Sequence, residues 1–534
     1  MREVTFDGLT LVSITILSPP TSPRCQSLLE ADTTTTDAKV QLPSFQQIAS
    51  STGATRERRR SSAASKKDRD KDRREANGQQ QREKARRQPS TISAGVQASG
   101  TEDEPEQEEA QPRARDNWDD DRATLVPALI TEDQERELFQ LFFDKININA
   151  ALLDPRLHKY EYVRKRSGFL LTVMTAIASR YVAGTGLSLD VPGKKSIFMD
   201  AMARARRAAA LALVTAGKSV ESCQAYILLT LFDKPTRPGE EDKGWQFSGL
   251  AIRMATDLNL HLTGPSHEIE QRVREHINRQ RVWLVCFNLD RSLSTQFGRP
   301  NTVLLDFPGV REWCYKNGRW NDPYDLTSCA FAEVMIAMTE FQKRVFRDEA
   351  GAASSGLALR GEDLKKLTLE YDTRIREICA VWKPRVEGHL PDYPGCSYRT
   401  LLWPFCVEYS RLVMFSFGFQ EAFQTGAIAS TEDFWFRECY NAAKTIVEVC
   451  VTSLLRSLVN YKFTFHSHYV YPTFAAAFLL KLLRPAFASF LPLGQKETIV
   501  QLVRSAVDVF NAVAVDDGHA PKHYARFLKN HLNK

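Results

Sequence analysis

The sequence predicts an all-α protein that is preceded by a disordered N-terminal quarter. From about residue 123 to the end, aromatic and aliphatic residues recur at helical spacing, and alternating strand patterns bounded by hairpin turns are missing. Residues 1–122 consist of Ser, Thr, Gln and charge runs, which cannot bury enough apolar surface to offset chain entropy. A body of about 410 residues is longer than the chain that a single hydrophobic core usually serves. We therefore expect one long helical array or two packed lobes.

The charge of the chain is concentrated in opposed blocks near the N-terminus. Residues 51–90 hold 14 basic and 6 acidic residues, whereas residues 101–122 hold 3 and 10. The net charge of +6 over 534 residues does not by itself indicate a nucleic-acid partner. The cysteines are scattered singly, which favours a reducing, intracellular compartment. The longest apolar stretch, residues 469–480, contains Pro472 and fits a buried helix better than a membrane span, so no membrane contact is predicted.

A first helix of the body is predicted to begin after Ser219 and to end before Pro235. Ser219 suits the N-cap position, and Glu221 lies in the first turn, where an acidic side chain is favourable. Apolar residues of this segment form one stripe at helical spacing: Val220, Cys223, Ile227 and Leu231. We therefore expect an amphipathic helix.

A second helix is predicted over residues 244–260 and is apolar on two faces. Trp245 is expected to be a core residue, and Gly249 is expected to let a neighbouring backbone approach. His261 follows directly, near the helix C-terminus, where its side chain can donate a hydrogen bond to the terminal carbonyl groups. We expect this helix to be covered on both sides.

A third helix is predicted over residues 276–297, with Gly298 after its end and Pro300 as a stop. Trp283 is expected to be a core residue. Asp290 lies between apolar residues, and a buried aspartate needs a cation beside it. We expect a structural charge cluster in which Asp290 has three candidate partners: Arg253, Arg291 and Arg299.

The phosphate-binding and nucleophile motifs of common enzyme classes are not found. The Gly-Lys pairs at residues 193–194 and 217–218 lack the earlier glycine of a phosphate-binding loop. Residues 184–186 lack the third glycine of a dinucleotide fingerprint, and no Gly-x-Ser-x-Gly elbow occurs. We therefore assign no catalytic residue and no cofactor-binding residue.

Metal sites are not predicted either. Residues 119–121 are three aspartates that suggest the magnesium ligands of helical isoprenoid enzymes, but they lie in the acidic segment outside any predicted helix. No Cys-x-x-Cys pair occurs. His466 and His468 face apart on a helix, so we interpret them as packed or partly exposed histidines.

The three helices carry a set of motifs that is specific when taken together. Residues 245–255 read Trp-x-x-x-Gly-x-Ala-x-Arg-x-Ala, and residues 258–261 read Leu-x-Leu-His. Asp290-Arg291 and Gly298-Arg299-Pro300 follow. This set resembles the middle homology region, or fungal-specific transcription factor domain, of fungal zinc-cluster transcription factors. The resemblance extends from about residue 135 to 345, and residues 346–534 resemble the variable helical C-terminal half of such proteins.

The resemblance implies a nuclear regulator of RNA polymerase II transcription, with the helical body as its regulatory part. Residues 123–345 would form the fungal-specific domain, and residues 346–534 would pack on it. Its implied partners are DNA, the transcription machinery or co-regulator proteins, a small-molecule effector and a second copy in a homodimer. The alternatives are a helical scaffold or co-regulator without DNA binding, and a helical isoprenoid-type enzyme.

One departure from the family pattern concerns zinc. Such factors carry six cysteines near the N-terminus as two Cys-x2-Cys-x6-Cys units that hold two zinc ions, but here only Cys25 precedes Cys223. Either upstream exons are missing or this member regulates without its own cluster. Zinc is therefore expected only with an additional N-terminal cluster, and no metal ligand or cofactor is assigned in this chain.

The basic block at residues 51–90 does not resemble a leucine-zipper basic helix, because residues 88–122 supply no apolar heptads. It is better interpreted as nuclear-import signals or as nonspecific phosphate contacts, and a solubilising mixed-charge linker is the alternative. The import candidates are Arg58, Arg59, Arg60, Lys66, Lys67, Arg86 and Arg87.

Overall fold

The computed structural model describes residues 125–533 apart from 127, 184, 188, 190–195, 216, 234–242, 263–268, 298–299, 304–308, 317–319, 347–356, 389–393, 429, 431–432 and 492. Within these described ranges all regular structure is helical and no strand is present, so the predicted all-α class is confirmed. The predicted disordered tail, its two charge blocks and the import candidates lie outside the described residues.

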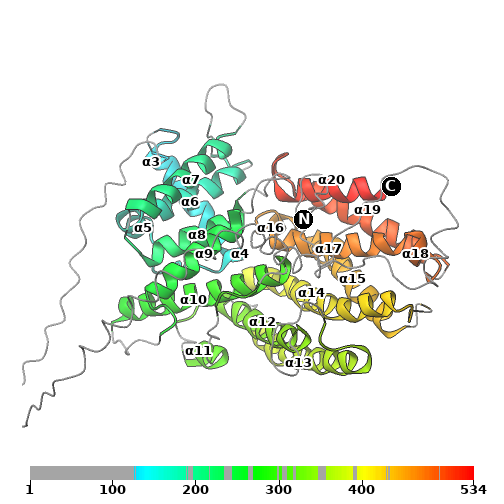
Figure 1. Cartoon of the computed structure of the whole chain (residues 1–534). Helices are drawn as coiled ribbons and strands as arrows, with labels where there is room; N and C mark the ends of the chain where they lie inside the picture. Colours follow the sequence, from blue (N-terminus) through cyan, green and yellow to red (C-terminus); the bar gives the residue numbers. More distant parts are fainter. Residues whose placement is uncertain are drawn as a thin grey trace, which may run out of the picture. The chain divides into compact units, whose positions relative to one another are not determined.

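The N-terminal group of helices packs around α6 and α8. Its members are α3 (Glu132–Leu141), the π-helical turn η3 (Phe142–Ile146), α4 (Asn147–Ala150), α5 (Tyr160–Arg166), α6 (Gly168–Ala178), η4 (Ser179–Tyr181), α7 (Phe198–Thr215), α8 (Val220–Phe232), α9 (Lys243–Asp257) and α10 (Glu270–Phe297). Helix α6 contacts α3, α5, α7 and α8, and α8 contacts α9 and α10 (Figure 1). This arrangement buries α6 almost completely.

Helix starts follow the local capping chemistry of the sequence. The predicted N-cap Ser219 accepts the backbone N–H of Ser222 at 3.0 Å and begins α8. Thr131 forms a complete capping box with Gln134 at the start of α3. The side chains of Ser167 and Asp433 accept backbone N–H groups in the first turns of α6 and α15 (Phe434–Thr452) and cap these helices.

The environment of α8 differs from the predicted one. The prediction of an amphipathic helix is wrong, because α8 is buried on all sides and even Glu221 is only 4% exposed. Helices α6, α7, α9 and α10 all contact it. Glu221 is compensated by Arg166, whose Nε donates to Oε1 at 2.7 Å.

Helices α9 and α10 lie close to their predicted ranges. Helix α9 ends at Asp257, and the chain then turns through Asn259, which has a left-handed φ of 55°. Helix α10 begins six residues before the predicted start and ends at Phe297 as predicted. The buried residues of α9 are Ser248, Ala251, Ile252 and Ala255, whereas Phe247, Leu250 and Met254 are half-buried.

The C-terminal group follows α10 and continues the packing. It consists of α11 (Val310–Lys316), α12 (Tyr324–Phe346), α13 (Gly361–Glu387), α14 (Pro394–Gln424), α15, η5 (Leu455–Ser457), α16 (Leu458–Tyr461), α17 (Ser467–Leu482), α18 (Pro485–Ala488), α19 (Gln495–Val513) and α20 (Ala520–Leu532). Helix α12 contacts α10, α13 and α14, and α17 contacts α14, α15, α19 and α20 (Figure 1). One continuous hydrophobic core runs through both groups, and all described residues belong to one compact unit.

A buried arginine links three helices of the C-terminal group. Arg411 on α14 is 7% exposed and joins three helices, because its guanidinium pairs with Asp372 of α13 at 2.6 Å and Glu438 of α15 at 3.1 Å.

The predicted buried helix over residues 469–480 is α17, with Pro472 inside it. Among the described residues, no helix is long and apolar enough to cross a membrane.

Candidate functional site

The motif residues of α9 face different surroundings. Trp245 is half-buried, so its prediction as a core residue is wrong. A Cβ added at Gly249 would meet nothing within 4 Å, so no neighbouring backbone requires this glycine. Arg253 is exposed, and Asp290 is not among its contacts. The larger apolar residues Phe247, Leu250 and Met254 are half-buried, and the ring of Phe247 lies 6.1 Å from that of Tyr226 on α8.

His261 follows α9 and packs against Trp283 of α10, with ring centroids 5.3 Å apart. Its Nδ1 is buried without a hydrogen-bond partner, so this nitrogen does not cap the helix as predicted. Arg279 performs that role, because its Nη2 donates to the carbonyl of Leu258 at 2.7 Å. Trp283 is 2% exposed and lies in the core.

Asp290 binds the segment that follows α10. Its carboxylate, 1% exposed, accepts the backbone N–H groups of Thr302 and Val303 at 3.0 Å and also the hydroxyl of Thr302. Arg291 donates to Asp290 at 3.1 Å and to the carbonyl of Val303 at 2.9 Å. Gly298 and Arg299 lie outside the described residues, and Pro300 is exposed. The Asp-Arg pair thus closes the loop after α10.

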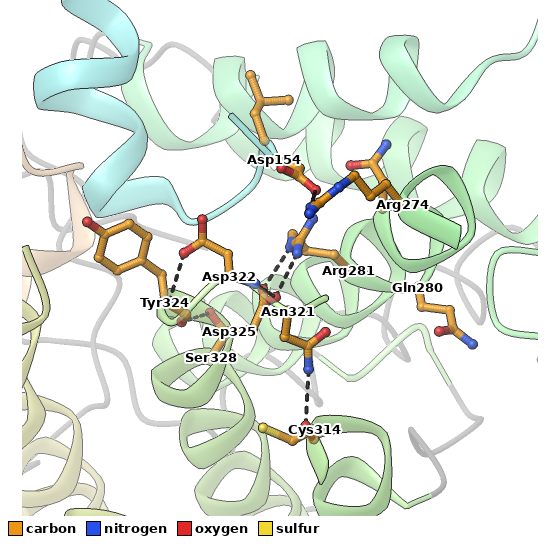
Figure 2. A network of polar contacts seen from close by, with 12 residues as sticks. Asp154, Arg274, Gln280, Arg281, Cys314, Asn321, Asp322, Tyr324, Asp325 and Ser328 are labelled. Atoms are coloured by element: carbon orange, nitrogen blue, oxygen red, sulfur yellow. Dashed lines mark hydrogen bonds and ion pairs between the residues drawn. The ribbon is translucent and has the colours of Figure 1, made fainter. Parts of the chain in front are cut away.

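A second buried cluster joins α10 to α12 (Figure 2). Arg281 donates from Nε and Nη2 to both carboxylate oxygens of Asp325, each at 2.7 Å, and both side chains are nearly fully buried. Two turns earlier on α10, Arg274 donates to Asp154 at 3.1 Å. Figure 2 shows both arginines reaching from α10 to these carboxylates. The cluster ties α10 to α12 and to the segment after α4.

Burial and neighbouring charges shift the pKa values of two acids of this cluster in opposite directions. Burial acts to raise the pKa of Asp154, but the Arg281 and Arg274 charges and the Arg156 backbone N–H bring it below its ordinary value. Burial and the Asp325 charge raise the pKa of Asp322 to about 6. Sequence reasoning missed this cluster, although Arg281 directly precedes the apolar run of α10. Only the fold brings Asp154 and Asp325 to it.

The structure contains a cavity between the two groups of helices. Its volume is about 120 Å³, and α8, α10, α12, α14 and α17 contribute to its walls. The apolar and aromatic lining residues are Ala150, Leu231, Val285, Leu289, Phe331, Leu402, Trp403, Cys406, Phe465 and Tyr471. The polar lining residues are Asn149, Asn288, Ser292, Thr327, Ser328, Arg399, Ser467 and His468.

Arg399 forms the cationic part of the wall. Its Nη1 donates to the carbonyls of Ile148 and Asn149 at 3.0 Å, and its Nε donates to Thr327 Oγ1 at 2.6 Å. His468 of α17 also lines the cavity. Burial together with the Arg399 charge lowers the pKa of His468 to about 3. His468 is therefore neutral at physiological pH, and Arg399 supplies the positive charge.

The two histidines that the sequence marked are packed, as interpreted. The Nε2 of His466 contacts the hydroxyl of Tyr524 at 2.5 Å, and burial lowers the pKa of His466 to about 4. Among the residues that the structure describes, no group of three or more His, Cys, Asp or Glu side chains is placed to hold a metal ion.

The domain predicted from the motif set can be compared with known families. Residues 139–307 match the model of the fungal specific transcription factor domain. This confirms the resemblance. The matched range begins within α3 and ends just after the loop that Asp290 and Arg291 close.

Similar curated proteins come from several fungi. The chain is 29% identical to Protein priB of Lentinula edodes over 215 residues, which cover 39% of this chain and 33% of that protein. It is 24% identical to the transcriptional activator of proteases prtT of Emericella nidulans over 307 residues, which cover 54% of this chain and 43% of that protein. It is 31% identical to the regulatory protein LEU3 of Saccharomyces cerevisiae over 90 residues, which cover 17% of this chain and 10% of that protein. The chain thus aligns with less than half of the length of each, and no solved structure matches it significantly.

Proposed function

We propose that this chain is a regulator of RNA polymerase II transcription that acts in the nucleus. The observation that carries the proposal is the domain match over residues 139–307, and the similar proteins include a transcriptional activator and a regulatory protein by name. The helical body, which contains the matched residues 139–307, is its proposed regulatory part. Co-regulator proteins and a second copy of the chain are its proposed protein partners.

We also propose that the chain regulates without catalysis. The cavity that lies beside α10 holds His468 as a neutral base of very low basicity, because its pKa is about 3. The lining thiol of Cys406 has its pKa raised to about 12 by burial and is therefore a poor nucleophile. The polar groups of this cavity suit binding better than acid–base or nucleophilic chemistry.

The regulatory role is tested by tethering. The whole chain, fused to an unrelated DNA-binding module, is expected to raise or lower expression of a reporter that carries the module's site. A matched control is the fusion with Asp325→Ala, which should lose the effect because it breaks the buried pair with Arg281. A reporter level equal to that of the module alone, with the fusion stably expressed, would overturn the proposal.

Nuclear entry is tested with the tagged chain in a fungal cell. We expect nuclear signal for the printed sequence and cytoplasmic retention when the import candidates are replaced by alanine: Arg58, Arg59, Arg60, Lys66, Lys67, Arg86 and Arg87. Substitution of the acidic residues 102–104 is the control and should leave the signal nuclear. Nuclear signal that survives the basic substitutions would refute this assignment.

DNA contact by this chain is proposed to be independent of sequence and to use residues 51–90. Phosphate contacts predict an affinity that falls linearly in log salt, with equal binding to probes that do and do not carry GC-rich half-sites. Specific readers instead prefer their site by roughly 10³-fold or more. Two equivalents of bound zinc in the purified chain, or a strong preference for one probe, would contradict the proposal.

A further inference from the structure

A short segment between η3 and α5 links the matched domain to the helices that follow it. Residues 147–158, here called the strap, comprise α4 and the loop after it. Near the start of the strap, Nη1 of Arg399 on α14 donates to the carbonyls of Ile148 and Asn149 at 3.0 Å each. Further along, the carboxylate of Asp154 pairs with α10. The strap therefore joins α10, inside the matched range, to α14, outside it.

The strap turns at a place where its own sequence favours a longer helix. Helix α4 ends after four residues at Ala151, which is buried and has a left-handed φ of 49°. Residues 150–153 read Ala-Ala-Leu-Leu, which are strong helix formers, and the first proline after them is Pro155. A left-handed conformation lowers the population of a residue with a Cβ roughly tenfold. Contacts from elsewhere in the fold therefore hold the turn against the local preference.

The turn and a longer helix use different hydrogen bonds of the same groups. In a continued α-helix, the carbonyls of Ile148 and Asn149 would accept the N–H groups that lie four residues later. In the structure both carbonyls accept Nη1 of Arg399 instead. The N–H of Leu153 donates to Oδ1 of Asn147 at 3.1 Å, and Nδ2 of Asn147 donates to the carbonyl of Leu153 at 2.8 Å. Two alternative bond sets in one short segment make it a two-state element.

Conversion of the turn into helix would move Asp154. Residues 152–154 lie outside any helix. A non-helical residue covers up to about 3.3 Å of path and a helical residue 1.5 Å, so three converted residues shift Asp154 by up to roughly 5 Å. At present Asp154 accepts Nη1 of Arg274 at 3.1 Å (Figure 2), and its carbonyl accepts the N–H groups of Leu157 and His158. A shift of that size breaks these contacts, so the state of the strap reaches the buried charges of α10.

We propose that the strap is a conformational switch between the matched domain and the C-terminal helices. Arg399 holds the strap in its left-handed turn, and loss of that contact lets α4 extend toward Pro155 and withdraws Asp154 from α10. The cavity of about 120 Å³ that Ala150 and Arg399 help to line provides space for this rearrangement.

The packing of α12 against α14 sets the position of the switch. Nε of Arg399 donates to Oγ1 of Thr327 at 2.6 Å, and Nη2 donates to Oγ of Ser328 at 3.5 Å. Both hydroxyls belong to α12, so a movement of α12 relative to α14 changes how Arg399 meets the strap. The inference goes beyond the proposed function and rests on it only for its biological meaning.

The test is hydrogen exchange of the purified full chain, measured by mass spectrometry on peptides that cover the strap. Arg399→Met removes the donors to both carbonyls and should speed exchange of the N–H groups of Leu157 and His158 about tenfold or more. Ala151→Gly favours the left-handed turn and weakens a helix, so it should restore about tenfold of that protection in the Arg399→Met background.

Matched controls separate the switch from general destabilisation. Ala212→Gly, at a buried position inside α7, loses the same methyl group but should restore no protection of the strap. Arg253→Met, at an exposed site on α9, should leave exchange of the strap unchanged. Peptides from α19 and α20 should exchange as in the unaltered chain. If Arg399→Met does not fold, Thr327→Val removes the acceptor of Nε and should speed the same exchange to a smaller extent.

Three results would overturn the inference. It is wrong if the strap of Arg399→Met, or of Thr327→Val in its place, exchanges like that of the Arg253→Met control. It is wrong if Ala151→Gly restores no more protection than Ala212→Gly does. It is also wrong if exchange rises equally in all peptides, which would mean global unfolding. Failure of the tethered reporter leaves these exchange rates unaffected, so the two proposals fail separately.

Discussion

The Arg281–Asp325 pair gives the sharpest prediction for stability. Both side chains are almost fully buried, 2% and 1% exposed, and two parallel hydrogen bonds of 2.7 Å join them. The substitution Asp325→Ala leaves the guanidinium buried without its carboxylate. Breaking a buried pair in this way costs about 3–5 kcal/mol. Asp325 also accepts the backbone N–H of Asp322 at 3.0 Å, so the start of α12 should loosen as well.

A double-mutant cycle separates the interaction free energy of the pair from the costs of the two single substitutions. Arg281→Met should cost about 3–5 kcal/mol, but the double variant should lose much less than the sum, because neither member of the pair then remains buried without the other. The free energy of unfolding is measured by urea denaturation of the full chain, followed by far-ultraviolet circular dichroism. As a control, Arg344→Met removes one member of the exposed Arg344–Glu370 pair, 52% and 55% exposed, and should cost at most about 1 kcal/mol. A cost below about 1 kcal/mol for Asp325→Ala, or simple additivity in the cycle, would refute the reasoning.

Three further predictions follow from burial and charge. In urea denaturation, Trp283→Ala should cost about 3–5 kcal/mol, whereas Trp245→Ala, at a half-buried site, should cost clearly less; equal costs would contradict the assigned burial. Because the folded pKa of Asp322 is raised to about 6, its unfolded form releases the proton first, and stability should fall as pH rises from about 4 to 6. Asp322→Asn should remove this loss and stabilise the chain at neutral pH, and an unchanged pH profile of the melting temperature would count against it. Asp290→Ala should speed hydrogen exchange of the two backbone N–H groups that it accepts, measured by mass spectrometry, and unchanged protection would show that other contacts hold the loop.

The sequence predicted the helical class and the three motif helices because these depend on local patterns. Ser219 accepts a backbone N–H within its own turn, so a cap can be recognised without knowing the fold. The end of α10 at Phe297 is likewise as predicted. The motif set could be assigned to its family because it is read directly from residue types and spacing.

Errors arose where a side chain's surroundings come from other helices. Trp245 and Gly249 lie on α9 at positions that other helices leave partly open, and helical spacing alone cannot show which apolar face is covered. The prediction for α8 failed in the opposite direction, since four neighbouring helices bury its polar side as well. Arg253 was a reasonable partner for Asp290 by charge, but the backbone of Thr302 and Val303 satisfies that carboxylate.

The sequence by itself determined that this chain is helical from about residue 123, that a capped helix begins after Ser219, and which family it resembles. Only the tertiary structure decided that Arg281 meets Asp325, 44 residues away, and that Asn149, Asn288 and Arg399 line one cavity. Capping and periodicity act over one or two turns, so the sequence displays them. Pairing of charges and the shape of a cavity depend on which helix faces pack together, and that is set by the sum of many long-range contacts.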